Sequence, residues 1–103
     1  MTTPRPNWQT ALEKNSPETS KAINALRQSV MAEGSLSIKT KTLMTMLCDA
    51  LLGHSDGVAN IAQRARTLGA SEAEIAETVA VAFYMGGMPG LVTGANAFRE
   101  QPK

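Results

Sequence analysis

The sequence contains few of the side chains on which redox and metal chemistry depend. It has one cysteine, Cys48, and one histidine, His54, in 103 residues. A lone cysteine excludes an internal disulfide, and neither paired cysteines nor an H-x-x-x-H spacing is present to hold a zinc ion. We therefore expect no cofactor and no metal site within one subunit. A site in which several copies of His54 converge on a symmetry axis stays open.

Charged residues are also scarce. Charged residues make up 18% of the chain, below the roughly 25% usual for soluble proteins, and the net charge is +1. The basic residues are scattered, so no face suited to nucleic-acid phosphates is visible. No unbroken apolar run approaches the roughly 18 residues of a membrane span, and no apolar leader opens the chain. These features predict a cytoplasmic protein without a nucleic-acid or membrane partner.

The apolar share of the chain indicates self-association. A single domain covering residues 1–103 buries only somewhat more than about 60% of its extended surface. Because 43% of the residues are hydrophobic, the chain has more apolar surface than a small core needs. We therefore expect a homo-oligomer.

Helix signals recur along the whole chain, and strand signals are almost absent. A short helix is predicted over 8–14 and a longer one over about 17–33, which Gly34 ends in a left-handed conformation. The next helix is predicted to start at Ser37 and end at Gly53, and the one after it to start at Ser55 or Asp56 and end at Gly69. A further helix starts with the capping box of Ser71 with Glu74 and stops within Gly86–Gly90. Pro89 then starts a last helix that runs through Phe98. The sequence predicts an all-α domain of five to six helices.

Apolar periodicity predicts which helix faces are buried. Cys48 lies beside Met44 in a wide apolar stripe, so we interpret it as an inert buried thiol. Phe83 is expected on the buried face of the fourth long helix, and Arg66 on the exposed face of the helix before it. Gly86, Gly90 and Gly94 are spaced by four, which fits either close helix packing or, for the first of them, a simple turn.

The segment 39–94 carries a family resemblance. It opens with "KTKTLMTMLCDALLGHSDGV" and contains "GASEAEI" and "MGGMP". This pattern resembles the carboxymuconolactone decarboxylase-like family, which includes the alkylhydroperoxidase D-type proteins, and in particular its small single-domain branch. The resemblance implies an all-α core with an antiparallel helical hairpin, assembled as a trimer or as a hexamer made of dimers. Of these we favour the hexamer.

The resemblance also implies a reactive site, most of which is missing here. Peroxidase-type members carry a glutamate, a C-x-x-C pair and a histidine four residues after the second cysteine. Aligned on "LGAS", these positions hold Thr42, His54, Gly57 and Ile61. The generic peroxiredoxin-like, antioxidant label therefore attaches by resemblance only, and we expect no dithiol peroxidase activity. Reduction of peroxide by Cys48 alone would require an exposed, activated thiol.

His54 has two interpretations. As an imidazole at the family's reactive position, oriented by Asp56 and assisted by the Thr42 hydroxyl, it could be a general base or acid acting on a small lactone-like or apolar molecule, as decarboxylase-type members do. As the residue after Gly53, it could instead only stabilise the ends of the two neighbouring helices, with Asp56 as the N-cap of the second. The first interpretation predicts a decarboxylase-like lyase. The second predicts a non-catalytic oligomer that binds a small ligand or acts as a structural protein.

Overall fold

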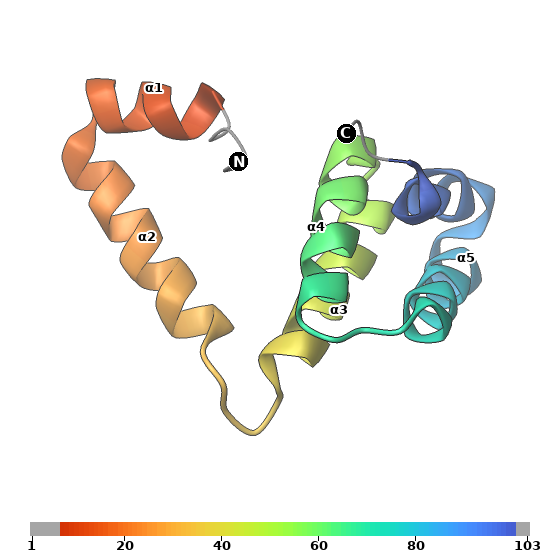
Figure 1. Ribbon diagram of the computed structural model, residues 1–103. Coiled ribbons are helices and arrows are strands. Elements are labelled where there is room, and N and C mark those ends of the chain that lie inside the picture. The colour runs from red at the N-terminus through yellow and green to blue at the C-terminus, as the bar shows by residue number, and fades with distance from the viewer. Residues whose placement is uncertain (1–6, 101–103) are drawn as a thin grey trace. The chain divides into compact units, whose positions relative to one another are not determined.

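The computed structural model describes residues 7–100, and every regular element in this range is a helix (Figure 1). The elements are α1 (Asn7–Asn15), α2 (Pro17–Met31), α3 (Ile38–Leu51), α4 (Ser55–Thr67), α5 (Glu72–Gly94) and the 3-10 helix η1 (Ala95–Phe98). The prediction of an all-α fold is confirmed. The chain divides after Ala32 into two compact units, which are described separately.

The first unit is a pair of helices, α1 and α2, packed against each other. Pro17 occupies the first turn of α2, where its missing N–H costs nothing, and Glu18 follows it. The helix ends at Met31, and Ala32 already has extended backbone with ψ 150°. Gly34 does not adopt a positive φ, so the prediction that it ends the helix in a left-handed conformation is wrong.

The second unit is built from α3, α4, α5 and η1 (Figure 1). The Ser37 hydroxyl accepts a hydrogen bond from Thr40 N at 3.0 Å and so begins α3 as predicted. Gly53, with φ 81°, follows the end of α3, and Gly69, with φ 96°, follows the end of α4. Both left-handed glycines were predicted as stops. The residue that precedes α4 is His54, one position before Ser55 and two before Asp56, the two predicted caps.

Small side chains dominate the core of this unit and allow the helices to approach closely. The buried apolar cluster consists of Met46, Ala50, Val58, Ala62, Ala65, Ala70, Ile75, Val79, Ala82 and Ala97. A Cβ at Gly90 would fall on the carbonyl oxygen of Ala82, and one at Gly94 would lie 3.2 Å from Val79. These glycines therefore serve close packing within the chain. Even one added methyl group would disturb such an interior.

Helix α5 begins with the predicted capping box and contains a sharp break. The Ser71 hydroxyl accepts from Glu74 N at 3.0 Å, while the Glu74 carboxylate accepts from Ser71 N at 2.8 Å. Gly87, with φ 67° and ψ −157°, interrupts the helical backbone. Such a conformation is essentially restricted to glycine. The predicted stop within Gly86–Gly90 is therefore a kink, and the helix resumes around Pro89.

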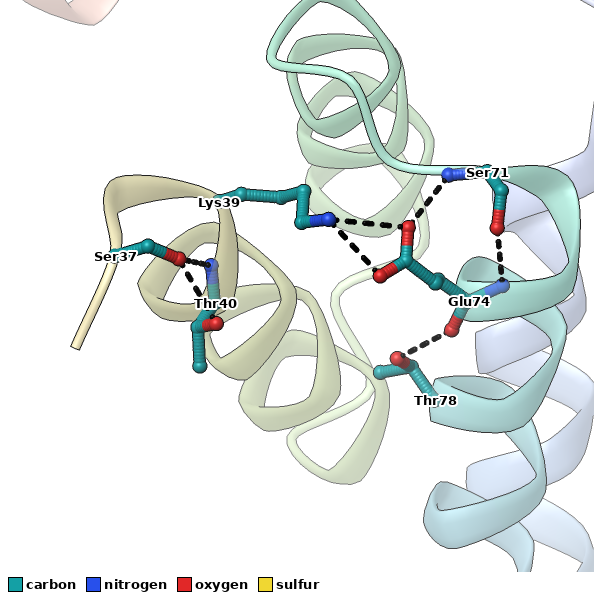
Figure 2. Close-up of polar contacts among 6 residues, drawn as sticks. All are labelled: Ser37, Lys39, Thr40, Ser71, Glu74 and Thr78. Carbon is teal, nitrogen blue, oxygen red and sulfur yellow. Dashed lines mark hydrogen bonds and ion pairs between the residues drawn. The ribbon is translucent and has the colours of Figure 1, made fainter.

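An ion pair joins the start of α3 to the start of α5, as Figure 2 shows. Lys39 Nζ donates to both Glu74 carboxylate oxygens, at 3.0 and 3.3 Å. One of these oxygens also accepts from Ser71 N, and the Thr78 hydroxyl donates to the Glu74 carbonyl at 2.8 Å. Glu74 therefore caps its own helix and ties that helix to α3.

Three predictions of burial are wrong. Cys48 and Phe83 are exposed rather than buried, the latter to 46%. Arg66 is not a solvated side chain, because its guanidinium donates to Glu72 and to the carbonyl of Ala97. The stripes predicted for α3 and α5 are wider than the faces that the neighbouring helices cover.

The segment Glu72–Phe98 is long and apolar enough, by length and composition, to cross a membrane. The expectation that no apolar run approaches the length of a membrane span is therefore wrong, since residues 78–98 carry no charged side chain, although the Gly87 kink interrupts the helix. The same test is passed by core helices of soluble proteins, although only 22% of this apolar window is buried within the chain. The segment therefore presents an apolar surface that the single chain leaves uncovered.

Candidate functional site

The turn between α3 and α4 holds His54 in a defined position. The left-handed Gly53 reverses the chain, and His54 N then donates to the carbonyl of Asp49 at 2.9 Å. The His54 carbonyl in turn accepts from Val58 N at 2.9 Å, inside the first turn of α4. The backbone of His54 is thus hydrogen-bonded to both helices, which fixes the position from which its side chain extends.

The side chain of His54 is paired with the carboxylate of Asp49. The distance from Nδ1 to Asp49 Oδ1 is 2.8 Å, with the His54 side chain 57% exposed and that of Asp49 22% exposed. An ionised carboxylate only accepts hydrogen bonds, so the proton of the neutral imidazole lies on Nδ1. Nε2 then keeps its lone pair. This arrangement is suited to taking a proton from, or returning one to, a molecule at the surface of the turn.

Asp56 is not the carboxylate that orients His54. Its Oδ1 accepts from Arg99 Nη2 at 3.1 Å, and its side chain is largely exposed. Asp49 takes the orienting position instead, a role that was not predicted for it. The available signal was a carboxylate in the last turn of α3, five residues before His54.

Thr42 lies in the core rather than at the surface. Its side chain is 1% exposed, and its hydroxyl donates to the carbonyl of Ile38 at 2.8 Å. The other two positions of the family's reactive site contribute no proton-transfer group either. Gly57 is half-buried, and the Ile61 side chain packs against the apolar cluster. The chemistry of the site therefore depends on His54 and Asp49.

Cys48 is adjacent to Asp49 in the chain and is exposed. Exposure alone does not make a thiol reactive, because reactivity also depends on groups that stabilise the thiolate. Within residues 7–100, no three histidine, cysteine or carboxylate side chains lie together as metal ligands. The donor set around His54 consists of one imidazole and one carboxylate, which is too small to hold a zinc ion in a single chain.

Large apolar side chains border the site. Leu51 and Leu52, which directly precede Gly53, are both exposed. The Leu51 side chain also lies against the kink of α5, where its Cδ2 is 2.7 Å from the position of a Cβ on Gly86. Further exposed apolar residues in the second half of α5 are Phe83, Tyr84, Met85, Met88 and Val92. The His54 turn thus adjoins an apolar region that another molecule could cover.

Comparisons with known proteins agree with this fold. The family model described as the carboxymuconolactone decarboxylase family matches residues 17–100. A solved carboxymuconolactone decarboxylase family protein from Legionella pneumophila, in its apo form, is 31% identical, with a TM-score of 0.81 over 85% of this chain and 79% of that one. A protein assigned as a carboxymuconolactone decarboxylase from Burkholderia xenovorans LB400 is 26% identical, with a TM-score of 0.84 over 90% and 74% of the two chains. No curated protein matches the sequence. The chain belongs to the carboxymuconolactone decarboxylase family.

Proposed function

We propose that the protein catalyses proton transfer on a small organic molecule, with His54 as the general base or acid and Asp49 as the residue that orients it. The observation that carries this proposal is the 2.8 Å contact between His54 Nδ1 and Asp49 Oδ1. The carboxylate selects the tautomer with a free Nε2 and stabilises the imidazolium that forms when Nε2 takes a proton.

The substrate class that we propose is a lactone-like carboxylic acid. The family description and the assignment of the Burkholderia xenovorans protein both name carboxymuconolactone decarboxylation. In such a reaction the bond to the departing carboxylate breaks, its electron pair remains on carbon, and carbon dioxide leaves. His54, protonated at Nε2, would deliver the proton that this carbon requires. The exposed apolar residues beside the turn would hold the rest of the molecule.

Reduction of peroxide by a dithiol is not part of the proposal. That reaction needs a nucleophilic thiol and a second thiol to resolve the sulfenic acid. The corresponding positions hold His54 and Gly57, and Cys48 is the sole sulfhydryl group of the chain.

The proposed assembly is a homo-oligomer, with a hexamer favoured over a trimer by the family resemblance. Support comes from the exposed apolar residues on α3 and α5, which border the His54 turn. A neighbouring copy seated there would both bury this surface and enclose the imidazole, which is open to solvent in one chain. No nucleic-acid or membrane partner is proposed, and the proposed location is the cytoplasm.

A set of variants tests the catalytic proposal. Carboxymuconolactone and related lactone acids are supplied to the pure protein, and release of carbon dioxide is measured. Because general acid–base catalysis contributes about 10²–10⁴-fold, we expect His54→Ala to lower kcat by about 100-fold or more. Asp49→Ala should lower it less, and Asn60→Ala, on an exposed part of α4, should leave it unchanged. Equal turnover by wild type and His54→Ala would contradict the proposal.

A second candidate function is a non-catalytic oligomer that binds a small apolar ligand. It is favoured by the position of His54 as the residue before α4, where the contact with Asp49 links the end of α3 to the start of α4 and so stabilises the turn. This alternative predicts that His54→Ala lowers thermal stability while leaving ligand affinity intact. Calorimetric titration of wild type and variant separates the two functions.

A further inference from the structure

Gly57 lies in the first turn of α4 and faces the Asp49 carboxylate. A Cβ at this position would fall on Asp49 Oδ2, 3.0 Å from Asp49 Cγ and 3.4 Å from the Cβ of His54. Cβ contacts shorter than 3.0 Å are essentially never observed, so any side chain at residue 57 would have to displace the carboxylate. One oxygen of Asp49 thus binds His54 while the other occupies the space above Gly57.

The backbone does not explain why glycine stands at this position. Positive φ angles among the described glycines occur at Gly53, Gly69 and Gly87, and Gly57 has none. Any residue could adopt its helical conformation, and alanine would favour the helix more than glycine does. Space for the carboxylate is therefore the feature of Gly57 that a larger residue could not supply.

We infer that Gly57 is a positioning residue: the missing side chain lets the Asp49 carboxylate lie against the first turn of α4 and hold His54 at Nδ1. That this arrangement serves catalysis rests on the proposed function, whereas the steric relation of Gly57, Asp49 and His54 does not. Residues 49, 54 and 57 form one steric unit, in which the His54–Asp49 contact depends on the absence of a Cβ at residue 57.

The single histidine makes the inference measurable without a substrate. Nitrogen-15 NMR of the imidazole reports which ring nitrogen carries the proton. In the wild type at a pH where the ring is neutral, we expect the proton on Nδ1. In Gly57→Ala the added methyl group displaces Asp49, so we expect the spectrum to shift toward that of Asp49→Ala. The exposed Asn60→Ala, which changes helix propensity in α4 without touching Asp49, should keep the wild-type spectrum.

A double variant distinguishes a steric clash with Asp49 from a general loss of stability. In the Asp49→Ala background the obstacle is gone, so Gly57→Ala should raise Tm through better helix propensity. In the wild-type background the same change should lower Tm or leave it unimproved. If Gly57→Ala does not fold, the double variant should still fold.

Two results would overturn the inference. One is a Gly57→Ala protein that keeps the wild-type imidazole spectrum, and the other is an effect of Gly57→Ala on Tm that is equal in both backgrounds. Neither result bears on catalysis by His54. Conversely, undiminished turnover by His54→Ala would remove the proposed function and leave the steric unit of residues 49, 54 and 57 standing.

Discussion

At the scale of single residues, Arg66 joins three helical elements. From α4, its guanidinium donates to Glu72 at the start of α5, at 2.6 and 2.9 Å, and to the carbonyl of Ala97 in η1 at 2.9 Å. The hydrogen bonds with Glu72 raise the pKa of Arg66 and lower that of Glu72. The Arg66 side chain is only 23% exposed, whereas that of Glu72 is 65% exposed. The bond to the Ala97 carbonyl is therefore the better shielded contact.

We predict that Arg66→Ala lowers the free energy of unfolding by about 1 kcal/mol, or roughly 4–8 °C in Tm. Arg66→Lys should recover only part of the loss, because one ammonium group lacks the planar fork that reaches both partners. Thermal unfolding followed by circular dichroism measures both changes. Arg64→Ala, two residues earlier and exposed, is the control. A loss as large in Arg64→Ala as in Arg66→Ala would contradict the prediction.

At the scale of helices, the Lys39–Glu74 contact makes the packing of α3 and α5 depend on pH. The hydrogen bond from Ser71 N, and then that from Lys39, lowers the pKa of Glu74 below the ordinary value of a carboxyl group. A carboxyl group with a lowered folded-state pKa stabilises the fold above its unfolded pKa. That contribution is lost as the pH falls through the lowered value.

We predict that Glu74→Gln is less stable than the wild type at neutral pH and that the difference shrinks toward about pH 3. Glutamine still offers an oxygen to Ser71 N but no charge to Lys39, so the variant lacks the charged contact at every pH. Urea midpoints at the two pH values measure the difference. The exposed Glu77→Gln, on the same helix, serves as the control. A difference that stays constant or grows on acidification would refute the assignment.

At the scale of the whole molecule, the exposed apolar surface is the dominant feature. Tyr84 is 85% exposed, and Met85, Met88 and Leu52 are each exposed by more than half. Large contiguous apolar patches are rare on monomeric soluble proteins and mark contact sites. These residues belong to the kinked part of α5 and to the end of α3, next to the His54 turn. Assembly and the proposed site are thus expected to share one region.

We predict that the wild type is an oligomer and that Tyr84→Glu combined with Met88→Glu lowers its mass toward that of one chain. Burying two carboxylates in an apolar contact is unfavourable, so the assembly should dissociate. Light scattering after size-exclusion chromatography gives the mass, and circular dichroism confirms that the helices persist. Ala73→Glu, exposed near the start of α5, should leave the mass unchanged. A monomeric wild type, or an unchanged mass in the double variant, would contradict the prediction.

The sequence by itself determined the helices and most of their ends. The Ser37 cap, the capping box of Ser71 with Glu74, and the left-handed stops at Gly53 and Gly69 were all predicted. Such signals act over three or four residues, so they can be read without knowledge of the rest of the chain. The membership of the family was also recognisable from the segment 39–94.

Only the tertiary structure decided which side chains meet and which faces are covered. Periodicity shows that residues share a helix face, but it does not show whether a neighbouring helix covers that face, so Cys48 and Phe83 were placed in the core wrongly. The partner of His54 depends on how the Gly53 turn sets α4 against α3, and this turn brings Asp49 to the imidazole. The space above Gly57 exists only once these two helices are packed, because it is bounded by atoms from both.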